Sequence, residues 1–223
     1  MRKALVVLFP LLLTGCAYDG GASAQKPKAT VWQIDNLSAI GGHPVEVLGA
    51  PTRLGGERKA LCFDGKADAI FLGVNPIEGW PRFTIEVLFK PDGDGPAEQR
   101  FLHIQDAQER RVLIETRVTA QRTWALDTFL RATDADKLTL LDNTRAQPTD
   151  AWYWAALVYD GNTMAHYVNG DKQLEGPVAF PAMEAGRISL GVRQNRVHWF
   201  KGCIAQARFS PQALAPASLR RPD

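Results

Sequence analysis

The stretch AWYWAALVYDGNTMAHYVNGD, residues 151–171, carries the strongest fold signal in the chain. It contains two short runs rich in apolar residues, and each run ends at a turn dipeptide, Asp160-Gly161 and then Asn169-Gly170. Tight hairpin turns need positive φ angles, which Asp-Gly and Asn-Gly pairs adopt readily. The stretch therefore predicts two antiparallel strands, over 152–159 and 163–168.

Two tryptophans stand at the start of the first predicted strand. Side chains of a strand alternate between its faces, so Trp152 and Trp154 share a face and Tyr153 points the other way. Such a pair can stack against sugar rings, or it can belong to the core. Because Ala156 and Val158 continue the tryptophan face with apolar side chains, we expect Trp152 and Trp154 to point inward.

The same period of two recurs along most of the chain. Residues 83–89 place Phe83, Ile85, Val87 and Phe89 on one face. About a dozen short strands with frequent turns are typical of a β-sandwich or jelly roll. Helical character is confined to residues near 211–219. The other predicted strands cover 100–105, 111–118, 123–132, 137–141, 187–192 and 200–209.

Several segments together match a known family pattern in order and spacing. They are ALCFDG at 60–65, AIFL at 69–72, the hairpin at 152–170 and FKGCIAQARF at 200–209. Over about residues 31–215 the chain resembles the laminin-G-like, concanavalin A-like lectin/glucanase domains of bacterial surface proteins. The resemblance implies an all-β, two-sheet antiparallel jelly-roll sandwich whose first and last strands lie side by side.

That implied neighbourhood concerns two cysteines. Cys62 lies in the first of these strands and Cys203 in the last, so the resemblance would let them face each other and form a disulfide. Disulfides persist in oxidising compartments outside the cytosol. The alternative is two unpaired buried thiols that pack as small apolar side chains.

The first sixteen residues have the features of an export signal. Arg2 and Lys3 precede an apolar run, residues 4–13, that is too short to span a bilayer and suits a signal peptide. The following Leu13-Thr14-Gly15-Cys16 resembles a lipobox, in which the thiol of Cys16 is lipidated. Ordinary cleavage after Ala22-Ser23-Ala24 is the alternative.

In bacterial lipoproteins an aspartate directly after the lipidated cysteine marks retention in the inner membrane. Because Ala17 stands at that position, the resemblance implies an outer-membrane lipoprotein that faces the periplasm or the cell surface. The membrane would then be a partner through lipid alone. The chain accordingly divides into a signal peptide (1–15), a lipidated terminus and flexible tether (16–29), a β-sandwich domain (30–217) and a tail (218–223).

Charge and metal-ligand patterns exclude several functions. The chain has 26 Lys and Arg against 24 Asp and Glu, and loss of Arg2 and Lys3 with the signal would leave 24 of each, which argues against a nucleic-acid partner. The histidines lack zinc-site spacing. Asp92-Gly93-Asp94 lacks the further oxygen ligands of a calcium loop, and Ala205-Gln206 stand where relatives carry an acidic pair. We expect no cofactor, with calcium as the alternative.

No catalytic residue is predicted. Retaining glycosidases of this fold carry E-x-D-x-x-E on one strand, so that two carboxylates flank one glycosidic bond. Two residues after Glu86 and Glu115, where this motif has aspartate, the chain has Leu88 and Arg117. No G-x-S-x-G nucleophile motif is present either.

The prediction is therefore a non-catalytic binding module for a carbohydrate or an envelope protein. A structural or assembly lipoprotein without a glycan ligand is one alternative, and a glycan-active enzyme lacking the usual motif is another. The ligand-binding candidates are aromatic residues near turns and the donor-rich loop 193–199: Trp80, Trp124, Arg193, Asn195, Arg196 and His198.

Overall fold

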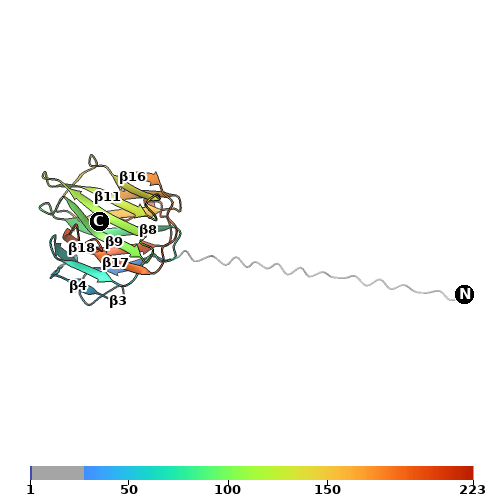
Figure 1. Ribbon diagram of the computed structural model, residues 1–223, viewed down its shortest axis with the longest axis horizontal. Helices are drawn as coiled ribbons and strands as arrows, with labels where there is room; N and C mark the ends of the chain where they lie inside the picture. The colour runs from blue at the N-terminus through green and yellow to red at the C-terminus, as the bar shows by residue number, and fades with distance from the viewer. Residues whose placement is uncertain (2–27, 223) are drawn as a thin grey trace.

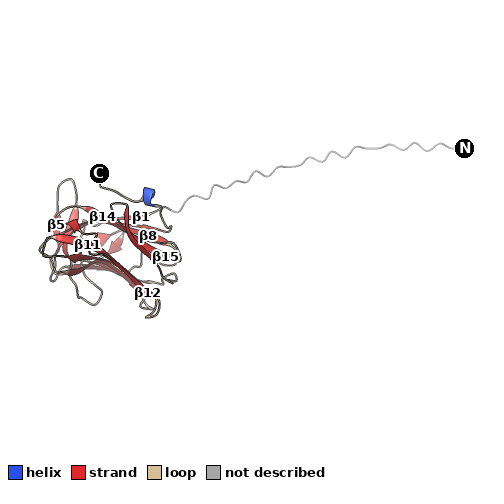
Figure 2. Cartoon of the chain, turned by 90° about the horizontal axis from the view of Figure 1, so that it is seen from above, coloured by secondary structure: helices blue, strands red, loops and turns tan. Residues whose placement is uncertain are grey.

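The computed structural model describes Met1 and residues 28–222, which form two β-sheets packed face to face (Figure 1). The expected signal peptide, Cys16 and most of the tether lie outside the described residues. Within the described part of the chain, no helix has the length and hydropathy needed to cross a membrane. Figure 2 shows that strands and loops make up nearly all of the domain, beside one short helix.

Sheet 1 has eight antiparallel strands. Its order is β16 (Asp171–Pro177), β15 (Thr163–Val168), β14 (Tyr153–Tyr159), β8 (Phe83–Pro91), β18 (Lys201–Ser210), β6 (Ala60–Asp64) and β5 (Thr52–Leu54), and β1 (Thr30–Gln33) pairs with β18. Chain segments from both ends of the domain therefore meet on one strand, β18, as the family resemblance implied.

Sheet 2 also has eight antiparallel strands. Its order is β12 (Lys137–Leu141), β11 (Thr123–Arg131), β10 (Arg111–Val118), β9 (Glu98–Asp106), β17 (Gly186–Leu190), β7 (Ala69–Leu72) and β4 (Glu46–Leu48), and β13 (Gln147–Pro148) pairs with β11. A small hairpin joins β2 (Ala39–Ile40) to β3 (His43–Pro44). The all-β two-sheet sandwich expected from the sequence is confirmed.

The core lies between the sheets and is rich in aromatic side chains. Phe83, Ile85, Val87 and Phe89 of β8 all face it, as their alternation predicted. The Phe89 ring stacks on Phe101 of sheet 2, with ring centroids 4.2 Å apart. Stacked aromatic pairs contribute about 0.5–1.5 kcal/mol beyond the area they bury, so this contact helps to fix how the sheets face each other.

The opening hairpin has the predicted turns. The Asp160 carboxylate accepts the backbone N–H groups of Asn162 and Thr163, each at 2.8 Å, and so orders the turn between β14 and β15. Asn169 and Gly170 take φ angles of 52° and 79° between β15 and β16, the two positive values that a tight hairpin turn requires.

The two tryptophans do not point into the core between the sheets as expected, although Trp154 is buried. Tyr153 and Leu157 of β14 point into the core, whereas Trp152, Trp154 and Ala156 lie on the outer face of sheet 1. The alternation was correct, but both faces of β14 are apolar because the C-terminal segment covers part of the outer face. Leu219 packs there against Ala156 and other apolar side chains.

The predicted disulfide is confirmed. Cys62 of β6 and Cys203 of β18 are direct partners in the strand register and form a disulfide across a sequence separation of 141 residues. In the loop-entropy description, a bridge over so long a separation contributes about 4–5 kcal/mol. The helical character expected near 211–219 is limited to one 3-10 turn, η1 (Pro216–Ser218).

Candidate functional site

The outer face of sheet 1 contains a groove of about 650 Å³. We call it the tryptophan groove. Its lining comes from distant parts of the sequence: the end of β1, the loop between β5 and β6, the start of β14, the middle of β18 and the C-terminal segment. Side chains with chemistry suited to a ligand are Gln33, Arg58, Trp152, Trp154, Gln206 and Arg220.

The two tryptophans give the groove its aromatic surface. Trp152 is half-buried, and the guanidinium carbon of Arg58 lies 5.1 Å from the centre of its ring. This is a cation–π contact, which holds Arg58 over the indole. Trp154 keeps 8% of its surface exposed. Its backbone N–H donates to the Asn169 side-chain oxygen at 2.9 Å, so the hairpin turn fixes the strand that carries it.

The floor of the groove lies over the disulfide. Trp152 packs with Leu88 against a small cluster that contains Cys62, Cys203 and Ala205. A register shift in β18 between Ile204 and Gln206 makes Ala205 an extra residue opposite β8. Such a bulge breaks the strict alternation of a strand, and Ala205 and its neighbour Gln206 both line the groove.

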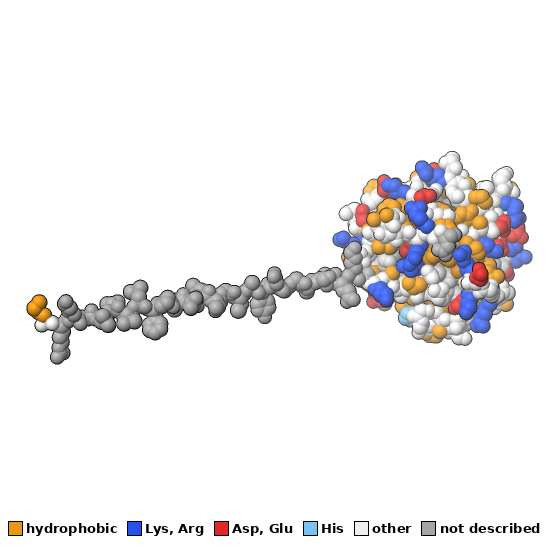
Figure 3. Space-filling model, turned by 180° about the vertical axis from the view of Figure 1, so that it is seen from behind, with side chains coloured by type: hydrophobic (Ala, Val, Ile, Leu, Met, Phe, Trp, Pro, Cys, Tyr) orange, Lys and Arg blue, Asp and Glu red, His pale blue; other side chains and the backbone are white. Residues whose placement is uncertain are grey.

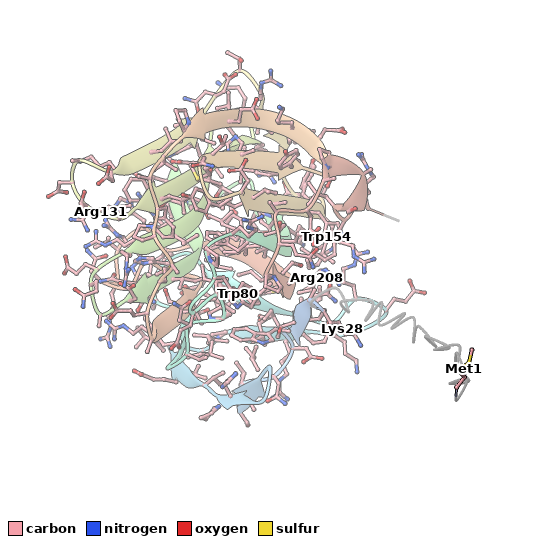
Figure 4. All side chains as sticks on the ribbon, turned by 90° about the vertical axis from the view of Figure 1, so that its right-hand side faces the viewer. Met1, Lys28, Trp80, Arg131, Trp154 and Arg208 are labelled. Atoms are coloured by element: carbon pink, nitrogen blue, oxygen red, sulfur yellow. A yellow bond between two sulfur atoms is a disulfide. The ribbon has the colours of Figure 1, made fainter. Side chains whose placement is uncertain are left out.

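The C-terminal segment forms one wall. Arg221 donates to the Asn169 carbonyl oxygen at 2.9 Å and lies 3.1 Å from the Asp171 carboxylate. The backbone N–H of Arg220 donates to buried Glu86 at 2.7 Å. The other carboxylate oxygen of Glu86 accepts from Arg208 at 3.3 Å. Trp154 and Arg208 lie near each other in Figure 4, on the side of the domain that also carries Lys28.

The outer face of sheet 2 carries a different feature, a buried charge cluster made of Glu98, Arg100, Glu115, Arg117 and Asp127. Glu115 of β10 and Asp127 of β11 are direct register partners and are almost fully buried. Arg100 donates to Glu115 at 2.8 Å, and Arg117 donates to Asp127 at 2.7 Å. The cavity beside them holds only about 210 Å³.

Burial dominates the electrostatics of this charge cluster. Removal from water, and secondly the nearby Asp127 carboxylate, raise the pKa of Glu115 to about 8. Burial also raises the pKa of Asp127, against the opposing effect of Arg117. Sequence inspection missed this carboxyl pair because its members lie on two strands, and only the register between β10 and β11 brings them together.

The residues predicted to contact a ligand do not gather in the tryptophan groove. Trp124 is completely buried against Phe89 and Tyr153, so the expectation that it stacks on a ligand is wrong. Its strand alternation directs it into the core, as for the other even-numbered apolar residues of β11. Trp80 is half-buried and packs against the core cluster.

The predicted loop 193–199 lies beside the charge cluster instead. Arg193 lines the small cavity next to Glu115 and Asp127. His198 lies 3.6 Å from Glu98, and burial, followed by the charge of Arg100, lowers its pKa. Asn195 and Arg196 are exposed in the turn between them.

Possible metal ligands are dispersed. Among residues 28–222, no group of three or more histidine, cysteine, aspartate or glutamate side chains is placed to hold a metal ion. In the Asp92-Gly93-Asp94 segment, the Asp94 carboxylate lies 2.6 Å from the Lys201 ammonium group. That ion pair holds Asp94 beside a protein cation.

Comparisons with known proteins agree with the fold. The family model of the concanavalin A-like lectin/glucanases superfamily matches residues 64–220. Domain 4 of AbnA, a GH43 extracellular arabinanase from Geobacillus stearothermophilus solved with arabinotriose, is similar with a TM-score of 0.59 and 19% identity, over 86% of this chain and 97% of that one.

Toxin domains are similar as well. The binding domain of botulinum neurotoxin serotype D gives a TM-score of 0.63 at 12% identity, over 84% of this chain and 48% of that one. The receptor binding domain of the C/D mosaic serotype gives 0.61 at 12% identity, over 85% and 49%. This chain thus spans about half the length of the toxin domains. No curated protein sequence matches it.

Proposed function

The chain belongs to the concanavalin A-like lectin/glucanase superfamily, and from this premise we propose that it is a non-catalytic domain that binds carbohydrate in the tryptophan groove. The observation that carries the proposal is the pair Trp152 and Trp154, placed on the outer face of sheet 1 among hydrogen-bonding side chains. Arabinotriose bound to domain 4 of the arabinanase agrees with a sugar ligand for this fold.

The groove has the two properties that sugar recognition needs. Tryptophan offers a large apolar face for the C–H side of a pyranose ring together with a polar indole N–H. Gln33, Gln206 and the arginines supply donors and acceptors for hydroxyl groups around that face. The volume of about 650 Å³ lies in the range of about 300–1,000 Å³ that is usual for small-molecule sites.

A glycan panel with matched variants tests the proposal. We expect the protein to retain at least one oligosaccharide, and Trp152→Ala or Trp154→Ala to weaken that binding at least fivefold, taking as a guide the roughly 1–3 kcal/mol that a nucleic-acid base gains by stacking on an aromatic ring. Trp199→Ala, which lies on the other sheet near Phe71, is the control and should bind normally. Glycan binding that survives both groove substitutions would contradict the proposal.

We further propose that the domain is anchored by lipid at Cys16 in the outer membrane. The support is the Leu13-Thr14-Gly15-Cys16 sequence, with Ala17 after the cysteine. Two or more acyl chains anchor a protein firmly, since each buried CH₂ contributes about 0.8 kcal/mol. Cys16→Ser should release the protein from the membrane fraction, and retention of that variant in the membrane would disprove lipid anchoring.

The carboxyl pair Glu115 and Asp127 is a feature of the described domain that favours a glycan-active enzyme. Glycosidases use a pair of carboxyl groups in which one, the general acid, has a raised pKa and the other stays ionised, whereas burial raises the pKa of both groups here. In addition, each carboxyl group already accepts a hydrogen bond from an arginine beside a cavity of about 210 Å³. Polysaccharide turnover that disappears in Glu115→Gln would establish the enzymatic alternative in place of the binding domain.

A further inference from the structure

The charges around the tryptophan groove are unequal. Two acidic side chains line it, Asp35 and Glu57, against five cationic ones: Arg58, Lys59, Arg208, Arg220 and Arg221. The lining therefore has a formal excess of three positive charges, which falls to one when the two cations paired with acids outside the groove are left out, although the whole chain is close to neutral. Lysine and arginine side chains also spread between the apolar patches on the face that Figure 3 shows.

Two of the five cations are balanced by acids that do not line the groove. Arg208 is paired with Glu86, and Arg221 with Asp171. Within residues 28–222, Arg58, Lys59 and Arg220 make no ion pair with any aspartate or glutamate. Their side chains keep hydrogen-bond donors for a ligand.

Arg58 and Arg220 are held in place by contacts that leave their charge unneutralised. The Trp152 ring orients the Arg58 guanidinium but removes none of its N–H donors. The backbone of Arg220 is fixed by its hydrogen bond to Glu86, which keeps the residue on the groove wall. The floor between them, Leu88, Ala205 and Gln206, carries no acidic group.

A neutral sugar can accept hydrogen bonds from guanidinium N–H groups, but it gains nothing from their unpaired positive charge. A carboxylate does, because arginine binds it through two parallel N–H···O bonds. We infer that the tryptophan groove takes an acidic sugar chain, with a ring against Trp152 and a carboxylate bound by the unpaired cations. This inference rests on the proposed function and names its ligand class.

The test compares acidic oligosaccharides with their own neutral forms. The full-length protein is titrated calorimetrically with oligogalacturonate and oligomannuronate, each beside the same chain after reduction of its carboxyl groups to alcohols. We expect one uronate at least to bind ten times more tightly than its reduced form. Raising the salt from 50 to 500 mM should weaken uronate binding several-fold, since exposed charges are screened.

Charge variants locate the effect. Arg58→Gln combined with Arg220→Gln should lower uronate affinity at least tenfold and leave binding of neutral sugars within twofold. Arg53→Gln, at an exposed arginine of β5 outside the groove, is the matched control and should change neither.

Two results would overturn the inference. If the reduced forms bind as tightly as the uronates and Trp152→Ala abolishes that binding, the groove binds neutral sugar and the proposed function stands without the acidic preference. If neither uronate binds while the glycan panel yields a neutral ligand, the inference fails in the same way. Absence of any ligand from the whole panel would remove the proposed function as well.

Discussion

The outer faces of the two sheets both carry arginines, but the arginines have different partners on each face. On sheet 1, arginines surround an open groove, and Arg58 contacts an aromatic ring in place of a carboxylate. On sheet 2, Arg100 and Arg117 form ion pairs with the buried acids Glu115 and Asp127, beside a cavity of about 210 Å³. Cations that are paired with buried acids have their donors occupied, whereas unpaired, exposed cations can donate hydrogen bonds to a ligand.

The largest loss of stability should follow from removing an arginine of the charge cluster on sheet 2. Arg117→Ala leaves the carboxylate of Asp127 buried without its main partner, and breaking a buried pair costs about 3–5 kcal/mol. Chemical denaturation should show this loss. Arg196→Ala, at an exposed arginine, should stay within about 0.5 kcal/mol. An Arg117→Ala protein as stable as the parent would contradict the assigned role of the charge cluster.

The second largest effect should follow from removal of the disulfide, which should lower both the stability of the domain and its affinity for sugar. Cys62→Ala together with Cys203→Ala should lower the free energy of unfolding by about 2–4 kcal/mol, which is less than the loop-entropy value because unfolded chains retain some structure. Because Trp152 packs on this bridge, sugar affinity should fall as well. Denaturation and calorimetry on the same samples measure both. If the folded double variant binds sugar with normal affinity, the disulfide does not support the floor of the tryptophan groove.

The smallest effect is a pH dependence at the charge cluster. The folded-state pKa of Glu115, about 8, exceeds its ordinary value of 4.5, so the folded protein holds this proton better and stability from Glu115 is lost as pH rises through that window. Glu115→Gln imitates the protonated form. Relative to the parent, its free energy of unfolding should increase steadily as the pH rises from 5 to 8 and level off above that, which denaturation at several pH values measures. A constant difference across that range would contradict the raised pKa.

Local sequence signals predicted the features that depend on one strand or one turn. The two turns at Asp160-Gly161 and Asn169-Gly170, and the core face of β8, follow from turn chemistry and alternation. The disulfide followed from the neighbouring strands that the family resemblance implied. In each case the deciding residues lie close in sequence or match a family segment.

Features that need a third element were not visible. Both faces of β14 are apolar, so alternation alone does not show which face points into the core. The outer face is apolar because Leu219, some sixty residues later in the chain, packs on it. The pair of Glu115 and Asp127 depends on the register between two strands. Trp124 is a different case, because its alternation with Leu126 and Leu130 along one strand places it in the core, and this signal was present in the sequence.

One measurement tests the central claim directly. The protein has six tryptophans, and the indole N–H signals in a nitrogen–proton NMR spectrum report each one during titration with a retained oligosaccharide. A ligand in the tryptophan groove should shift the signals of Trp152 and Trp154, while those of buried Trp32 and Trp124 and of Trp80 and Trp199 stay in place. Shifts at Trp80 or Trp199 with Trp152 and Trp154 unchanged would contradict this account.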